Sequence, residues 1–143
     1  MSSWRDSASQ QAQDDLDGLL DTVMPLARKM LDKSGEFFPF GASVSARGES
    51  RLWSGDPGKG EHPASAEVIS MLVDGLRQRR DDLRAAAICF DVQLPDTDAV
   101  RVEFEHRDGQ AIAVVLPYKK KRFGRGVDYR DLRGSTANKQ VWV

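Results

Sequence analysis

The stretch GEFFPFGA, residues 35–42, joins a long amphipathic helix pattern to the first strand pattern of the chain. Phe37, Phe38 and Phe40 are three of its six phenylalanines. Three rings this close cannot all face water without forming a large apolar patch. We therefore expect Phe38 or Phe40 to be buried against the preceding helix, so that the segment locks helix and sheet together or lines a concave surface. A pocket lined by Phe37, Phe38, Phe40 and Trp53 is the binding hypothesis that follows.

The helix expected before this segment covers about residues 13–33. Its apolar residues recur at three- and four-residue steps and form one stripe, which contains Leu16, Leu19, Leu20, Val23, Ala27, Met30 and Leu31. Gly35 follows at the position where a left-handed cap is expected. Pro25 removes one hydrogen bond and either bends the helix or splits it near Thr22. The stripe continues in phase beyond Pro25, which favours one bent helix.

Beyond the segment, the sequence predicts two short strands, a second helix and three further strands. These patterns cover residues 40–45, 51–54, 66–82, 85–94, 100–106 and 111–116. The order α-β-β-α-β-β-β predicts an α+β fold, in which a five-stranded antiparallel sheet carries its helices on one face and an irregular C-terminal tail follows. Profilin-like and roadblock-like folds share this order, but a likeness of fold implies no function.

Length and composition predict a single domain. The 143 residues suit one core, divided here into an N-terminal extension (1–12), an α+β core (13–118) and a basic segment with a tail (119–143). A net charge of −1 gives no overall electrostatic reason to bind nucleic acid or an anionic membrane. No apolar run approaches the roughly 20 residues that span a bilayer, and the first residues lack the apolar core of a signal peptide. These features predict a cytoplasmic protein.

Candidate catalytic groups are few, and each has a simpler interpretation. Glu103 and Glu105 project from one face of a strand and could divide acid and base roles, but Arg101 beside them indicates a charged strip of alternating sign. Asp91 could add a third carboxylate and a weak metal site. The loop GDPGKG, residues 55–60, follows a strand as a phosphate loop does, yet two residues separate its glycines where four are needed. A connector is the better interpretation.

Neither histidine nor the cysteine indicates a nucleophile. His62 lies in the Gly/Pro-rich loop and His106 closes a hairpin, and the local sequence gives neither an orienting partner. Cys89 lies between Ile88 and Phe90, in surroundings that raise the pKa of a thiol. As the single cysteine it excludes an internal disulfide, and we expect it in the core. No catalytic residue, cofactor or metal site is therefore predicted.

The basic segment is the strongest functional signal in the sequence. Its cations are Lys119, Lys120, Lys121, Arg122 and Arg125, and Phe123 lies among them. Such a segment could bind nucleic-acid phosphates and stack one base, or bind an acidic protein partner. Lysines at the end of an edge strand also discourage aggregation. The sequence leaves these three roles open.

Two further features concern packing. Residues 141–143, VWV, form an apolar terminus that either docks on the fold or anchors a partner. In the hairpin around Asp108-Gly109, a two-residue turn would place carboxylates beside core residues. A three-residue loop, 107–109, instead pairs Phe104 with Ile112 and puts Gly109 where a left-handed residue follows a type I turn. We therefore predict the three-residue loop.

Three stretches carry a resemblance to known proteins: GEFFPFGA, EHRDG at residues 105–109 and LPYK at residues 116–119. Over most of residues 16–129 the chain resembles a group of small uncharacterised bacterial proteins. No established activity belongs to that group, so the resemblance implies a small bacterial intracellular protein and assigns no functional residue.

The function predicted from the sequence is that of a non-enzymatic protein-interaction module, of the adaptor or immunity type. Such a module would work through its sheet or its basic segment. One alternative is a nucleic-acid-associated protein that uses residues 119–125. The other is a small-ligand binder or hydrolase with an aromatic-lined pocket, which requires Glu36, His62 or Asp91 to meet the clustered rings. The sequence predicts no membrane association and no particular oligomeric state.

Overall fold

The computed structural model describes residues 4–54, 65–124 and 126–143. Its helices are α1 (Trp4–Ser7), α2 (Gln10–Ser34) and α3 (Ser65–Arg79), and a 3₁₀ turn (Arg80–Asp82) follows α3. Its strands are β1 (Phe40–Ser45), β2 (Ser50–Ser54), β3 (Leu83–Gln93), β4 (Asp98–His106), β5 (Ala111–Lys120), β6 (Val127–Tyr129) and β7 (Arg133–Thr136). The predicted α+β class is confirmed. Among the described helices, none has the length and apolar character needed to cross a membrane.

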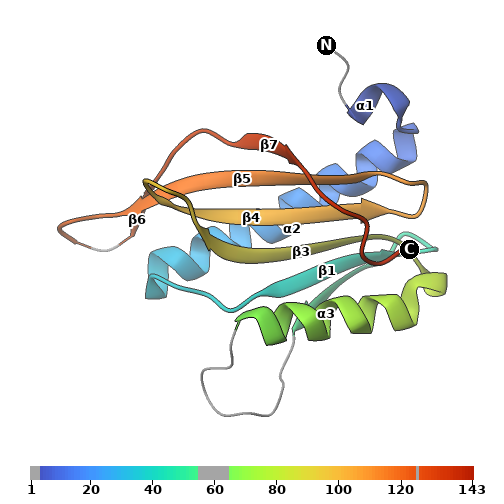
Figure 1. Cartoon of the computed structure of the whole chain (residues 1–143), viewed down its shortest axis with the longest axis horizontal. Helices are drawn as coiled ribbons and strands as arrows, with labels where there is room; N and C mark the ends of the chain where they lie inside the picture. Colours follow the sequence, from blue (N-terminus) through green and yellow to red (C-terminus); the bar gives the residue numbers. More distant parts are fainter. Residues whose placement is uncertain (1–3, 55–64, 125) are drawn as a thin grey trace.

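The strands form one antiparallel sheet in the order β2-β1-β3-β4-β5-β6, and β7 pairs with another part of β5 (Figure 1). The prediction of five strands was wrong, because β6 and β7 lie in the tail that was expected to be irregular. Tyr129 of β6 pairs with Tyr118, and Arg133 of β7 pairs with Val115. Every residue of β7 is exposed, so this strand carries no apolar alternation that the sequence could reveal.

The two long helices cover opposite faces of the sheet, which corrects the expectation that both lie on one face (Figure 1). Ala87 and Cys89 of β3 pack in the cluster that contains α2, whereas Ala86 and Ile88 pack in the cluster that contains α3. Successive strand residues point to opposite faces. The double-sided apolar pattern of β3 therefore reflects a central strand with a helix on each side.

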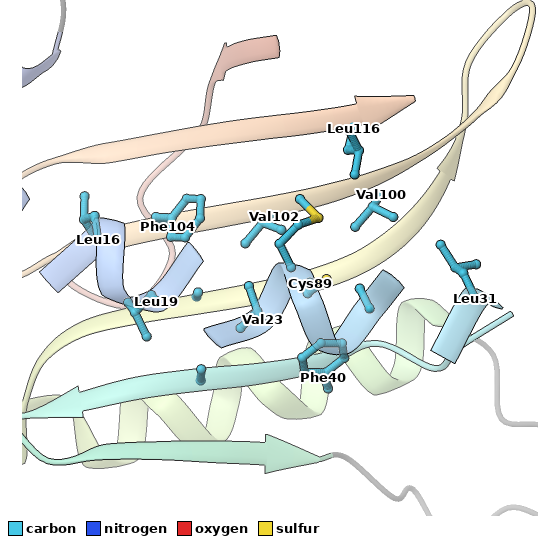
Figure 2. Close-up of a cluster of buried hydrophobic side chains, with 14 of the residues drawn as sticks. Leu16, Leu19, Val23, Leu31, Phe40, Cys89, Val100, Val102, Phe104 and Leu116 are labelled. Atoms are coloured by element: carbon cyan, nitrogen blue, oxygen red, sulfur yellow. The ribbon is translucent and has the colours of Figure 1, made fainter. Parts of the chain in front are cut away.

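The main core lies between α2 and the sheet, where Phe40 packs with the predicted apolar stripe (Figure 2). Phe40 is 7 % exposed, so the prediction that Phe38 or Phe40 is buried against the first helix is confirmed. The helix continues through Pro25 as one element. It ends where Gly35, at a φ of 74°, donates its N–H to Leu31 O at 2.8 Å. The predicted left-handed cap is confirmed.

The hairpin between β4 and β5 has the predicted three-residue loop. Phe104 pairs with Ile112, and His106 N–H donates to Gln110 O at 2.9 Å. Gly109 has a φ of 115°, a conformation that L side chains rarely adopt. Burial of the apolar face therefore determined the register more strongly than the two-residue turn signal did.

Candidate functional site

A pocket of about 650 Å³ lies at the C-terminal end of α2, and we call it the helix-end pocket. The left-handed cap at Gly35 turns the chain there, so that residues 35–38 face the adjoining ends of β3, β4 and β5. The pocket is lined by Met30, Ser34, Gly35, Glu36, Phe37, Phe38, Ser65, Asp91, Val92, Gln93, Asp98, Tyr118 and Lys120. It brings Glu36 and Asp91 together with two of the clustered rings.

A hydrogen-bonded pair, Asp91 and Tyr118, forms part of the wall. Tyr118 is 1 % exposed, and its hydroxyl donates to both carboxylate oxygens of Asp91 at 2.9 Å. Desolvation raises the pKa of the Asp91 carboxyl, and the Tyr118 hydrogen bond and the charge of Lys120 only partly oppose that rise. Burial and the neighbouring carboxylate raise the pKa of the Tyr118 hydroxyl. The tyrosine is therefore fixed as a hydrogen-bond donor.

Negative charge predominates among the described residues of the pocket. Glu36, Asp91 and Asp98 contribute carboxylates, and Lys120 contributes the cation. The C-terminal end of a helix adds a partial negative charge through its unpaired carbonyl groups. A Cβ built on Gly35 would lie 3.7 Å from the amino group of Lys120, so this cation reaches the end of the helix. The pocket is thus suited to a positively charged ligand.

The four aromatic residues grouped by the sequence do not form one lining. Phe37 packs edge-on against Phe40, with ring centroids 5.9 Å apart, and also lines the helix-end pocket. Phe38 is 48 % exposed at the pocket wall. Phe40 belongs to the core, and Trp53 lies on the α3 side, where its Nε1–H donates to Ser43 at 2.8 Å. Phe37 and Phe38 therefore supply the aromatic surface.

The cations of the basic segment are divided between different surroundings. Lys120 lines the helix-end pocket, whereas Lys119 lies opposite Asp128 of β6 in the sheet. Lys121 and Arg122 follow the end of β5 and are exposed. Arg122 stacks over the ring of Phe123, which is 83 % exposed. Arg125 lies outside the described residues. The described cations of the segment thus face different surroundings.

His106 has a partner that local sequence analysis could not identify. Its Nε2 lies 2.9 Å from Asp15, 91 residues earlier in the chain, and Arg84 donates two hydrogen bonds of 2.9 Å to the same carboxylate. Asp108 N–H donates to His106 Nδ1 at 3.2 Å, which makes Nε2 the donor to Asp15. The His106 side chain is 0 % exposed. This group joins the start of α2 to the sheet and offers a substrate no access.

The remaining chemical candidates are separated or committed to packing. Glu103 and Glu105 lie on the α3 side of the sheet, whereas Asp91 lies on the α2 side. Cys89 is buried in the core, and desolvation raises the pKa of its thiol. The described residues contain no cluster of three or more histidine, cysteine, aspartate or glutamate side chains that could hold a metal ion. The loop 55–63, with His62, lies outside the described residues.

Comparison of the chain with protein-family models, with curated proteins and with solved structures gives no match. The helix-end pocket combines volume, aromatic surface and an excess of one charge, which makes it the candidate site.

Proposed function

We propose that this chain is a non-enzymatic protein-interaction module, of the adaptor or immunity type, that binds a positively charged side chain of its partner in the helix-end pocket. The observation that carries the proposal is the combination of Phe37 and Phe38 with three carboxylates at the end of α2. A Lys or Arg side chain can place its stem on the rings and its charge beside Glu36 and Asp98.

The state of the titratable groups supports binding over catalysis. The Tyr118 proton is held by Asp91, and its raised pKa opposes its transfer near neutral pH. The Cys89 thiol is buried and its pKa is raised, so it is a poor nucleophile. His106 is enclosed at the other end of α2. Tyr118, Cys89 and His106 are thus committed to structure, whereas the pocket presents charges and rings.

The proposal can be tested with two peptides that differ by one charge. Acetyl-Gly-Arg-Gly-amide and its citrulline counterpart have nearly the same shape, but only the first is cationic. We expect the arginine peptide to shift amide NMR signals of residues 35–38, 91–93 and 118, and the citrulline peptide to shift them far less. Asp98→Asn should weaken binding about five-fold, as loss of an exposed ion pair worth about 1 kcal/mol predicts.

A matched control uses an acidic residue distant from the pocket. Glu49 lies in the turn between β1 and β2, at the other end of the sheet, and is exposed. Glu49→Gln should leave the affinity for the arginine peptide unchanged. Equal shifts with both peptides, or equal losses in Asp98→Asn and Glu49→Gln, would remove the charge-based proposal.

A second candidate function, binding of nucleic acid, is favoured by the exposed ring of Phe123 beside Arg122. Phosphate contacts and one stacked base would use this tip. Binding should then weaken steeply between low and moderate salt, because cations that contact phosphates release counterions. Joint replacement of Lys119, Lys120 and Lys121 by Glu should abolish it. Absence of a mobility shift with nonspecific DNA and RNA at low salt would remove this candidate.

A further inference from the structure

The C-terminal tail is held through its backbone by one carboxylate. The Glu105 carboxylate accepts hydrogen bonds from the N–H groups of Gln140, Val141 and Trp142, at 2.9, 3.0 and 3.3 Å respectively. Glu105 is 7 % exposed. Successive backbone N–H groups that converge on an anion form a nest, and charged acceptors make such bonds stronger than neutral ones. The fold thus presents a carboxylate that binds the main chain of the tail.

Two arginines hold the opposite side of the same backbone. Arg77 near the end of α3 donates to the carbonyl oxygen of Gln140, and Arg80 of the 3₁₀ turn donates to the carbonyl oxygen of Val141 at 3.2 Å. These contacts, like those of Glu105, use atoms that every peptide possesses. Recognition of the main chain is therefore largely independent of the tail sequence.

Side-chain recognition rests mainly on Val141, and Trp142 packs partly buried against the same cluster. Val141 is 2 % exposed and packs in the cluster formed by α3 and β3, between Leu76 and the face of Ala86 and Ile88. By contrast, Val143 is 70 % exposed. Residues 137–139, which connect β7 to the docked segment, have no regular structure. The tail therefore occupies its groove as a tethered ligand that bends at Val141 and inserts that aliphatic side chain.

We propose that the groove between α3 and β4 is a peptide-binding site, occupied here by the chain's own residues 140–142. Its other occupant is a segment of a partner protein that carries a β-branched aliphatic residue followed by an aromatic one and takes up the same bent backbone. The tail is then a competing self-ligand that the partner must displace. The site lies on the sheet face opposite α2, so the inference is independent of the function proposed for the helix-end pocket.

Removal of the tail isolates the groove. In a variant that ends at residue 138, a fluorescein-labelled peptide NKQVWV, which reproduces residues 138–143, should bind saturably in an anisotropy titration. Glu105→Gln should weaken that binding at least ten-fold, since a neutral amide accepts the N–H groups far less well. The peptide change that corresponds to Val141→Ala should have a similar effect. A folded, cooperatively melting variant that binds none of the peptide would overturn the proposal.

Asp74→Asn is the matched control in the same variant. Asp74 lies on α3, the helix that borders the groove, and is exposed. This change should leave the affinity for the peptide unchanged. Equal losses in Asp74→Asn and Glu105→Gln would show general electrostatic attraction of the peptide and would overturn the proposal.

The intact chain gives a second test that does not depend on the truncated form. A short tether gives the tail a millimolar effective concentration, so several millimolar unlabelled NKQVWV should displace it. The Val141 amide NMR signal should then move toward its random-coil position, while signals from β3 and β4 stay dispersed. A Val141 signal that does not respond to the peptide would overturn the proposal even if the truncated variant fails to fold.

Discussion

An aspartate lies near each end of α2, and the two aspartates have different roles: one ties the helix to the sheet, and the other faces the helix-end pocket. Near its start, Asp15 is 7 % exposed and is satisfied by Arg84 and His106. Near its end, Asp91 of β3 faces the helix-end pocket, accepts the Tyr118 hydroxyl and remains exposed to solvent. A carboxylate that is enclosed with an arginine and a histidine donor ties helix to sheet. A carboxylate that is only partly desolvated and lies beside further carboxylates remains available to bind a positively charged ligand.

The difference teaches that a structural ionisable group is distinguished from a binding one by its partners as well as by its burial. At the start of α2, which we call the closed end, each oxygen of Asp15 has a partner within the fold. At the other end, which adjoins the helix-end pocket and which we call the open end, desolvation raises the pKa of Asp91. The negative charge of Asp98 raises this pKa further. A ligand cation would lower that pKa again, so at a pH where Asp91 is still partly protonated, binding in the helix-end pocket would release a proton. The following predictions test this contrast.

The largest effect is expected at the open end, where Phe38 and Phe40 lie two residues apart in different surroundings. Phe40→Ala should lower the free energy of unfolding by about 3–5 kcal/mol, because it leaves a cavity in the core. Phe38→Ala should cost under about 1 kcal/mol, as expected for a side chain that is 48 % exposed. Urea denaturation measures both. Similar losses would contradict the assignment of Phe40 to the core and Phe38 to the pocket.

The next effect concerns the closed end. Asp15→Ala should lower the free energy of unfolding by about 3 kcal/mol, because it leaves Arg84 and His106 without their shared acceptor. Asp14→Ala, at the neighbouring exposed position, should cost under about 0.5 kcal/mol. Denaturant melts of the two variants form a matched pair. Equal stabilities would mean that the buried group does not tie α2 to the sheet.

Features that depend on local physics could be predicted from the sequence. The helix stripe follows from apolar spacing, the Gly35 cap from the freedom of glycine at positive φ, and the β4–β5 register from the need to bury Phe104 and Ile112 together. Each of these involves residues within a few positions of one another, or a hairpin whose apolar face is unambiguous. The structure confirms all three.

Features that depend on distant parts of the chain could not be predicted in the same way. Which face α3 covers is decided by packing across the sheet, and β7 is exposed throughout, so it carries no pattern. The sequence contains only a weak indication that Asp15 and His106 form a pair. Asp15 lies four residues before Leu19 on the apolar stripe, and His106 shares the inward face of β4 with Phe104. Polar residues on two apolar faces suggest a partner, but not which one.

A smaller effect is expected from Tyr118→Phe, which removes the hydroxyl without changing the ring. The loss should be about 1 kcal/mol, typical of one hydrogen bond, because water can reach the exposed Asp91 carboxylate. The Tyr118 hydrogen bond lowers the pKa of Asp91, so its removal should raise that pKa further. NMR titration of the Asp91 side chain measures the shift. A fall in this pKa would contradict the assigned donor role.

The smallest effect, and the most direct test of the open end, is the pH dependence of Asp91→Asn. Folding raises the pKa of this carboxyl through desolvation, so the folded state binds the proton more tightly than the unfolded state does. The favourable contribution is therefore present at low pH and is lost as pH rises through the folded pKa. Asparagine carries no charge and can still accept the Tyr118 hydroxyl. Asp91→Asn should thus be more stable than the natural chain at about pH 7, by under about 1 kcal/mol because solvent screens this exposed group.

That advantage should shrink as the pH falls below about 4, the ordinary pKa of an aspartate, because Asp91 then becomes protonated in the unfolded state as well as in the folded one. Urea melts of both proteins across this range measure the difference. The corresponding change at the closed end, Asp15→Asn, should destabilise the protein at about pH 7, because it removes the charge that Arg84 and His106 share. Opposite signs for the two substitutions would establish the contrast between the two ends of α2. A loss of stability in Asp91→Asn that grows with pH would instead show that Asp91 is held as a structural carboxylate, as Asp15 is.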